Sequence, residues 1–127
     1  MSEIYWEDLA EKIEGELSLD EATLKQHSED ASVFSIKPKA VLFPKNKDDV
    51  LAAIHFCREN SIPIHSWGAG TSRGGQPLGN GLVINFREHM NNILGYDEKN
   101  YTLTVAPGAF YSEVQKFLLE KKLFSIF

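Results

Sequence analysis

The strongest constraint on this chain is a glycine-rich segment in its middle. Six of the nine glycines lie within GAGTSRGGQPLGNG, residues 68–81. Glycine loses more conformational freedom on folding than any other residue, so this density predicts a backbone that turns tightly or approaches another molecule closely. Consecutive amides in such a loop can point inward and bind an anion, and the Thr71 and Ser72 hydroxyls add donors. A phosphate or diphosphate site is one interpretation, and a wide surface turn between two strands is the other.

Two familiar phosphate-binding motifs fit this segment poorly. In a P-loop the second glycine is followed by lysine, but here Gly75 is followed by Gln76. In the dinucleotide fingerprint G-x-G-x-x-G opens a helix, whereas here Arg73 stands at the third glycine position and a strand follows the loop. Backbone amides and hydroxyls, rather than a helix N-terminus, would therefore have to hold the anion.

Charge is divided unevenly along the 127 residues. Residues 1–30 carry ten acids against two lysines, while the rest carries eleven Lys and Arg against eight acids. No acidic side chain lies between Glu59 and Glu88, which leaves room for an anion without repulsion. No basic cluster suggests a nucleic-acid partner.

Composition narrows the class of protein further. No apolar run approaches the ~20 residues that span a bilayer, and the acidic start does not resemble a secretory signal. A single cysteine, Cys57, leaves no internal disulfide, and no metal-ligand spacing stands out. We therefore expect a cytoplasmic protein without a metal site.

The pattern of elements predicts an α+β fold. Residues 1–30 read as an acidic helical segment, with helices over 3–14 and 20–27 and Asp20 as an N-cap. Extended runs follow at 33–36 and 40–43, then a helix over 46–60 capped by Asn46, and strands at 63–67 and 81–86. A hairpin over 92–105, a helix over 110–122 and a strand beginning at 123 complete the order. We expect a small mixed sheet with a parallel β-α-β piece flanked by helices.

The residues from 43 to 94 resemble a known family. The run FPKNKDDVLAAIHFCRENSIPIHSWGAGTSRGGQPLGNGLVINFREHMNNIL is similar to the start of the FAD-linked oxidases, whose flavin fold is shared by vanillyl-alcohol oxidase, p-cresol methylhydroxylase, D-lactate dehydrogenase and the flavin-binding component of glycolate oxidase. The loop matches at Gly68, Gly70, Thr71, Ser72, Gly75 and Gln76. The strand GLVIN and the turn VAPG, residues 105–108, match as well. The resemblance spans roughly residues 38–127.

This resemblance implies non-covalent FAD and a site for it. It places the FAD diphosphate against the loop and the nucleotide beside the following turn, with these cofactor-binding candidates: Trp67, Gly68, Ala69, Gly70, Thr71, Ser72, Arg73, Gly75, Gln76, Pro107 and Gly108. The family commonly carries arginine where this chain has Trp67, which can only stack or pack. Arg73 is a candidate to compensate for that missing charge, and a solvated loop residue is the alternative. No catalytic residue is identified.

The family's flavin domain continues beyond the length of this chain. The resemblance therefore implies that residues 31–127 form the first half of an FAD-binding subdomain, truncated before the second half and the substrate domain. We expect the FAD-binding portion of a 2-hydroxy-acid oxidase or dehydrogenase, inactive alone. Its partners would be the remainder of the flavoprotein, or a second copy through an open C-terminal edge at Leu123, Phe124, Ile126 and Phe127. The alternative is a non-catalytic binding module that keeps the fold without flavin.

Overall fold

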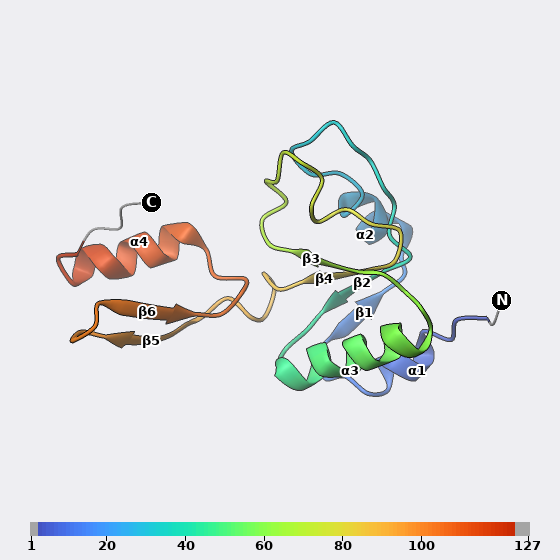
Figure 1. Ribbon diagram of the computed structural model, residues 1–127, viewed down its shortest axis with the longest axis horizontal. Coiled ribbons are helices and arrows are strands. Elements are labelled where there is room, and N and C mark those ends of the chain that lie inside the picture. Colours follow the sequence, from blue (N-terminus) through green and yellow to red (C-terminus); the bar gives the residue numbers. More distant parts are fainter. Residues whose placement is uncertain (1–2, 124–127) are drawn as a thin grey trace.

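The computed structural model describes residues 3–123, and Figure 1 shows their arrangement. The elements in chain order are α1 (Glu7–Ala10), β1 (Glu16–Ser18), α2 (Glu21–Gln26), β2 (Ala40–Phe43), α3 (Lys47–Glu59), β3 (Ile64–Trp67), β4 (Leu82–Asn85), β5 (Ile93–Asp97), β6 (Thr102–Val105) and α4 (Tyr111–Glu120). A four-stranded sheet with helices forms the larger part, and the β5-β6 hairpin with α4 lies beside it (Figure 1). The strand expected to begin at 123 lies largely outside the described residues.

The main sheet has the order β1-β2-β4-β3. Strand β4 pairs in parallel with both neighbours, Val83 lying opposite Val41 of β2 and His65 of β3. Strand β1 pairs antiparallel with β2, with Leu17 opposite Leu42. The expected mixed sheet with a parallel β-α-β piece is confirmed, with α3 crossing from β2 to β3 and β4 inserted between those two strands.

Side chains of the central strands alternate between two cores. One face of the sheet packs under α1 and α3, and its buried residues are Leu9, Ala40, Leu42, Ala53, Phe56, Cys57, Ile62, Leu82 and Ile84. The other face packs under α2 and the glycine loop through Leu24, Val41, Trp67, Leu78 and Val83. A parallel sheet buried on both faces explains why β2 and β4 are apolar throughout most of their length.

The N-terminal segment differs from its expectation. Instead of one helix over 3–14, the chain forms the short α1 and then turns into β1. The turn is held by Asp49 of α3, whose carboxylate accepts hydrogen bonds from the backbone N–H groups of Glu14 (2.8 Å), Gly15 (2.9 Å) and Lys45 (2.8 Å). The contacts with Glu14 and Gly15 join residues far apart in sequence, so the local helix pattern could not anticipate them.

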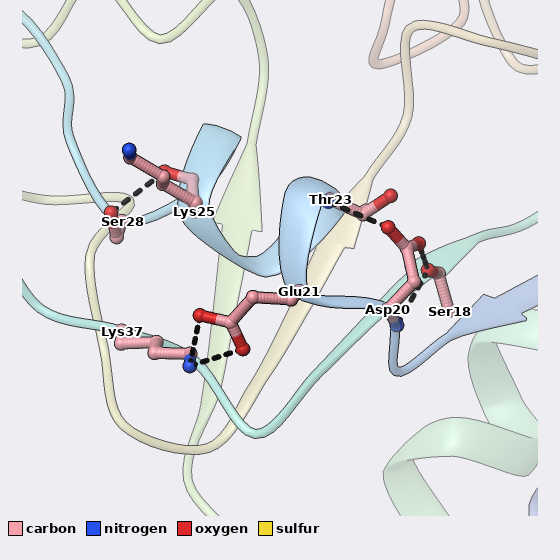
Figure 2. A network of polar contacts seen from close by, with 7 residues as sticks. All are labelled: Ser18, Asp20, Glu21, Thr23, Lys25, Ser28 and Lys37. Atoms are coloured by element: carbon pink, nitrogen blue, oxygen red, sulfur yellow. Dashed lines mark hydrogen bonds and ion pairs between the residues drawn. The ribbon is translucent and has the colours of Figure 1, made fainter.

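Both expected N-caps are confirmed. Asn46 Oδ1 accepts from the N–H of Asp49 at 2.9 Å at the start of α3. At the start of α2, Asp20 accepts from the N–H of Thr23 at 3.0 Å and from the Ser18 hydroxyl, as Figure 2 shows. These hydrogen bonds, that from Ser18 first, lower the pKa of Asp20 to about 2. The cap thus remains charged at neutral pH.

Residues 33–36 form no strand of the sheet. Their hydrogen-bonded contacts include an isolated bridge between Glu29 and Ser35 and a hydrogen bond from the Ile36 N–H to the Ser28 carbonyl at 2.9 Å. The Val33 side chain is 95% exposed, and the Phe34 ring lies against Gly75. This segment therefore runs beside the glycine loop instead of pairing with a strand.

The hairpin and final helix form a separate packing unit. Strands β5 and β6 pair antiparallel, and α4 rests on them through the Phe117 ring, whose centroid lies 5.9 Å from that of Tyr96. No described residue of α4 is fully buried. The unit follows β4 directly and brings the turn 106–110 back towards the glycine loop (Figure 1).

Candidate functional site

The glycine loop leaves the carboxyl end of β3 and returns to β4. The loop takes a left-handed turn at Gly70, which has φ +67° and would place a Cβ 2.6 Å from Cζ2 of Trp67. Only glycine fits both demands, since the left-handed conformation disfavours a side chain and the indole fills the space. Trp67 is itself buried, with its ring 4.8 Å from that of His27. The loop is therefore built on a packed aromatic base.

The start of the loop presents unused hydrogen-bond donors. Within residues 3–123, the backbone N–H groups of Ala69, Gly70, Thr71 and Ser72 donate to no protein acceptor. The Ser72 hydroxyl bonds to the Gln76 side chain, and the Gly74 N–H reaches Ser72 Oγ at 3.4 Å. A run of free amides around a left-handed glycine is the arrangement that binds anions.

Two hollows meet at the first two residues of the loop. The first, of about 350 Å³, is lined by Ser66, Gly68, Ala69, Gly70, Thr71, Ser72, Gln76 and Pro77. The second, of about 210 Å³, is lined by Gly68, Ala69, Arg87, Pro107, Gly108, Ala109, Phe110, Tyr111 and Ser112. Gly68 and Ala69 belong to both linings, so the same two residues border both hollows. Neither lining includes a carboxylate.

Gly68 differs from the other glycines of the loop. A Cβ built on Gly68 would meet nothing within 4 Å, and its φ lies outside the left-handed region. Folding therefore does not require glycine there, and the space that a side chain would occupy is open. Gly108, which lines the second hollow, has no such space, because a Cβ there would overlap the Phe86 carbonyl oxygen. That glycine lets the turn 106–110 approach the end of β4.

The fold brings most of the candidate residues together. Eight of the eleven line the two hollows: Gly68, Ala69, Gly70, Thr71, Ser72, Gln76, Pro107 and Gly108. The Trp67 side chain packs in the core beneath the loop. Gly75 has φ +76° and lies against Phe34, while Arg73 is exposed and lines neither hollow.

Sequence reasoning missed five lining residues of the second hollow: Arg87, Ala109, Phe110, Tyr111 and Ser112. Arg87 follows β4, and its guanidinium carbon lies 3.9 Å from the centroid of the Phe110 ring. Arg87 falls in the acid-free stretch before Glu88, which was a usable signal. Its position opposite the loop depends on the return of the chain through the hairpin, and no local pattern encodes that return.

Other polar groups of the molecule lie apart from these hollows. The His27 Nδ1–H donates to the Thr23 carbonyl at 2.8 Å, so Nε2 accepts from the Asn85 side chain at 2.9 Å. Burial raises the pKa of the Cys57 thiol to about 11, which keeps it neutral and unreactive.

Among residues 3–123, no three His, Cys, Asp or Glu side chains gather as a metal site. No helix in this range has the length and apolar composition for a bilayer crossing.

Comparison with curated proteins finds relatives that are named for 2-hydroxy acids. Glycolate oxidase subunit GlcD from Bacillus subtilis is 39% identical over 89 residues, covering 68% of this chain and 19% of that protein. D-2-hydroxyglutarate dehydrogenase from Pseudomonas putida is 30% identical over 113 residues, covering 87% of this chain and 11% of that protein. The chain thus spans a fifth or less of the length of these relatives.

Solved structures share the fold. The 4-ethylphenol oxidase of Gulosibacter chungangensis superposes with a TM-score of 0.78 at 24% identity, over 91% of this chain and 24% of that one. p-Cresol methylhydroxylase superposes with a TM-score of 0.71 at 19% identity, over 86% of this chain and 23% of that one. The expected p-cresol methylhydroxylase-type fold is confirmed.

The family comparison covers the sheet, the glycine loop and the turn that faces it. The FAD binding domain family matches residues 38–127, which is more than half of the chain. The chain therefore belongs to the FAD-binding domain family of FAD-linked oxidoreductases related to 2-hydroxy-acid dehydrogenases, and its cofactor is FAD.

Proposed function

We propose that the two hollows joined at Gly68 form the FAD diphosphate site of this chain. The open space above Gly68 carries the proposal, because a ligand rather than a protein group would fill it. The loop residues 68–72 and Gln76 form one wall, and Pro107 with Gly108 forms the other. Trp67, Arg73 and Gly75 support or flank the loop without lining the hollows.

The donors at this site fit the chemistry of FAD. The diphosphate is an anion that needs several hydrogen-bond donors, and the free amides of residues 69–72 and the Thr71 hydroxyl supply them. No carboxylate on either lining opposes it. When bound, FAD supplies the redox chemistry, and the residues of this chain bind and orient it.

The cofactor would be held without a covalent bond. Histidines attach flavin in some proteins of the resembled family, and His65 stands just before the loop. A Cβ on Gly79 would overlap the His65 ring, so the imidazole packs against the far end of the loop. His65 lines neither hollow.

The whole activity requires more protein than this chain. Glycolate and D-2-hydroxyglutarate, for which the two relatives are named, are both 2-hydroxy acids. The chain would be the FAD-binding portion of an oxidoreductase for such an acid. No catalytic group is identified in it, and alone it would bind FAD without turnover.

One observation favours a second function. At the position where the resembled family commonly has arginine, the Trp67 side chain is buried among Leu24, Val41, Leu78 and Val83. A chain that had lost flavin binding could keep this packing. A non-catalytic module without flavin is therefore the alternative.

The hairpin unit suggests the other partner. Leu94 is 64% exposed and Leu119 is 59% exposed, while α4 has no fully buried residue among those described. Such apolar surface is typical of a protein interface. The remainder of a longer flavoprotein, or a second copy of the chain, would cover it.

The single, buried Cys57 accords with a cytoplasmic location.

A matched pair of glycine variants tests the site. Gly68 and Gly95 both have open space where a Cβ would stand, but only Gly68 lines the hollows. We expect Gly68→Ala to lower FAD affinity at least about tenfold without loss of stability, and Gly95→Ala to leave both unchanged. Flavin fluorescence and isothermal titration would measure binding. Equal affinities for the two variants would refute the loop assignment, and absence of FAD binding even in a longer chain would favour the non-flavin module.

A further inference from the structure

We propose that Arg87 supplies the positive charge for the FAD diphosphate, the role for which Arg73 was the sequence candidate. This inference rests on the diphosphate site proposed above and identifies the side chain that completes it. Trp67, at the start of the loop, is buried and carries no charge. The charge would then come from the opposite wall of the site.

The backbone of Arg87 is fixed on both sides. Its N–H donates to Asn85 Oδ1 at 2.9 Å, and its carbonyl accepts from Asn91 Nδ2 at 2.7 Å. The Asn85 side chain is buried and also donates to His27 Nε2 at 2.9 Å. Arg87 is therefore anchored to the core through Asn85, at the point where β4 ends.

The side chain of Arg87 lies over the Phe110 ring at the second hollow. Its guanidinium carbon lies 3.9 Å from the centroid of the Phe110 ring, and both residues line the hollow that includes Gly68 and Ala69. Stacking on an aromatic face leaves the guanidinium N–H groups at the edge available for hydrogen bonds. Arg87 is half-buried, so its charge is less screened than one on the open surface.

Arg87 also has no anionic partner within the described chain. The side-chain ion pairs of residues 3–123 join Lys37 to Glu21 and His89 to Glu16, and none includes Arg87. A half-buried guanidinium without a carboxylate gains most from an anion that enters the same hollow, and planar, bidentate contact with phosphate oxygens suits this group.

The other two arginines lack this placement. Arg73 is exposed and lines neither hollow. Arg58 is exposed in the last turn of α3. Arg87 is thus the only arginine of the chain that lines the proposed site, and Arg58 offers a matched control for the loss of one positive charge.

The experiment compares three variants of the full chain, Arg87→Gln, Arg73→Gln and Arg58→Gln. The ligands are FAD, ADP as the diphosphate without flavin, and riboflavin as the flavin without diphosphate. Binding is measured from the backbone amide chemical shifts in NMR titrations, which detect complexes with dissociation constants up to the millimolar range. We expect Arg87→Gln to lower the affinities for FAD and for ADP roughly tenfold to a hundredfold. The affinity of Arg87→Gln for riboflavin should equal that of the unaltered chain. Arg58→Gln should bind all three ligands with the affinities of the unaltered chain.

Two further measurements separate charge from structure. The affinity for FAD should fall with added salt less steeply in Arg87→Gln than in the unaltered chain, because one ionic contact is missing. Arg87→Lys keeps the charge without the planar group, so it should retain an affinity between those of Arg87→Gln and the unaltered chain. Equal urea-unfolding midpoints would show that the variants fold alike.

The experiment distinguishes a wrong role for Arg87 from a wrong position of the diphosphate site. Suppose that the unaltered chain binds FAD, and that Arg73→Gln lowers the FAD affinity while Arg87→Gln does not. The role assigned to Arg87 is then wrong, and the diphosphate site stands. An equal loss of FAD and riboflavin in Arg87→Gln would also overturn the charge role. If the unaltered chain binds neither FAD nor ADP, the proposed site fails and this inference fails with it.

Discussion

Gly70 lies directly against the indole of Trp67. A Cβ on Gly70 would come within 2.6 Å of Cζ2, and the backbone of Gly70 is already in the left-handed region at φ +67°. The left-handed turn at Gly70 and the aromatic base beneath it therefore depend on each other. This contact explains how a loop of so many glycines can hold one shape.

The first prediction follows from that contact. Gly70→Ala should destabilise the chain by about 2 kcal/mol or more, because the left-handed conformation alone costs roughly 1–2 kcal/mol and the indole must move as well. Urea unfolding followed by tryptophan fluorescence measures the change. Gly68→Ala is the control and should shift the free energy of unfolding by less than about 0.5 kcal/mol. Equal effects would mean that the loop does not rest on Trp67.

This difference also decides which glycine can test the cofactor site. A β-branched residue at Gly70 would abolish FAD binding by disrupting the loop, so loss of binding there would not separate folding from recognition. Gly68 makes no such contact. The substitution at Gly68 therefore reports on the ligand.

A second prediction concerns the buried carboxylate of Asp49. Asp49→Asn places an amide where three backbone N–H groups donate, so at least one donor loses its acceptor. We expect a loss of roughly 2–4 kcal/mol in the free energy of unfolding. Asp48→Asn, the exposed neighbour in the same first turn, should cost less than about 1 kcal/mol. Similar losses in the two variants would show that the Asp49 contacts do not hold the turn before β1.

A third prediction concerns Cys57 and pH. Burial raises the pKa of its thiol to about 11, so the folded chain holds the proton longer than the unfolded chain does. The associated stability is complete below the ordinary thiol pKa and is lost as pH rises through about 11. At pH 8 a thiol-specific reagent should react roughly a hundredfold more slowly with the folded chain than with the chain in urea. Equal rates would contradict the burial of this side chain.

A fourth prediction concerns the hairpin unit. The α4 helix has no fully buried residue among those described, whereas β2 and β4 lie between two packed layers. Amide hydrogens of β5, β6 and α4 should therefore exchange faster than those of β2 and β4. Hydrogen exchange followed by NMR measures this difference. Uniform protection would show that the unit folds together with the sheet.

Much of the fold was predictable because its signals are local. The caps Asn46 and Asp20 mark two helix starts, and the apolar runs at β2 and β4 reflect burial on both faces of a parallel sheet. The family motif also named most of the residues that line the hollows. Each of these signals lies within a few neighbouring residues.

The parts that sequence missed depend on distant contacts. Strand β1 is three residues long and exists through pairing with β2, and the turn before it depends on Asp49. The run at 33–36 is apolar but faces the glycine loop and solvent instead of a strand. The acid-free stretch before Glu88 includes Arg87, but it does not predict the contact with Phe110, because the hairpin is what returns Phe110 to the side of Arg87.

The most direct test of the account is to map FAD onto the chain by amide chemical shifts. A titration of isotopically labelled protein should move the amides of residues 68–72, Arg87 and Gly108, since these surround the joined hollows. The amides of Glu16 and Gln26, which line a different hollow, should stay in place. Shifts confined to that second region, or none at 68–72 while FAD is bound, would contradict the proposed site.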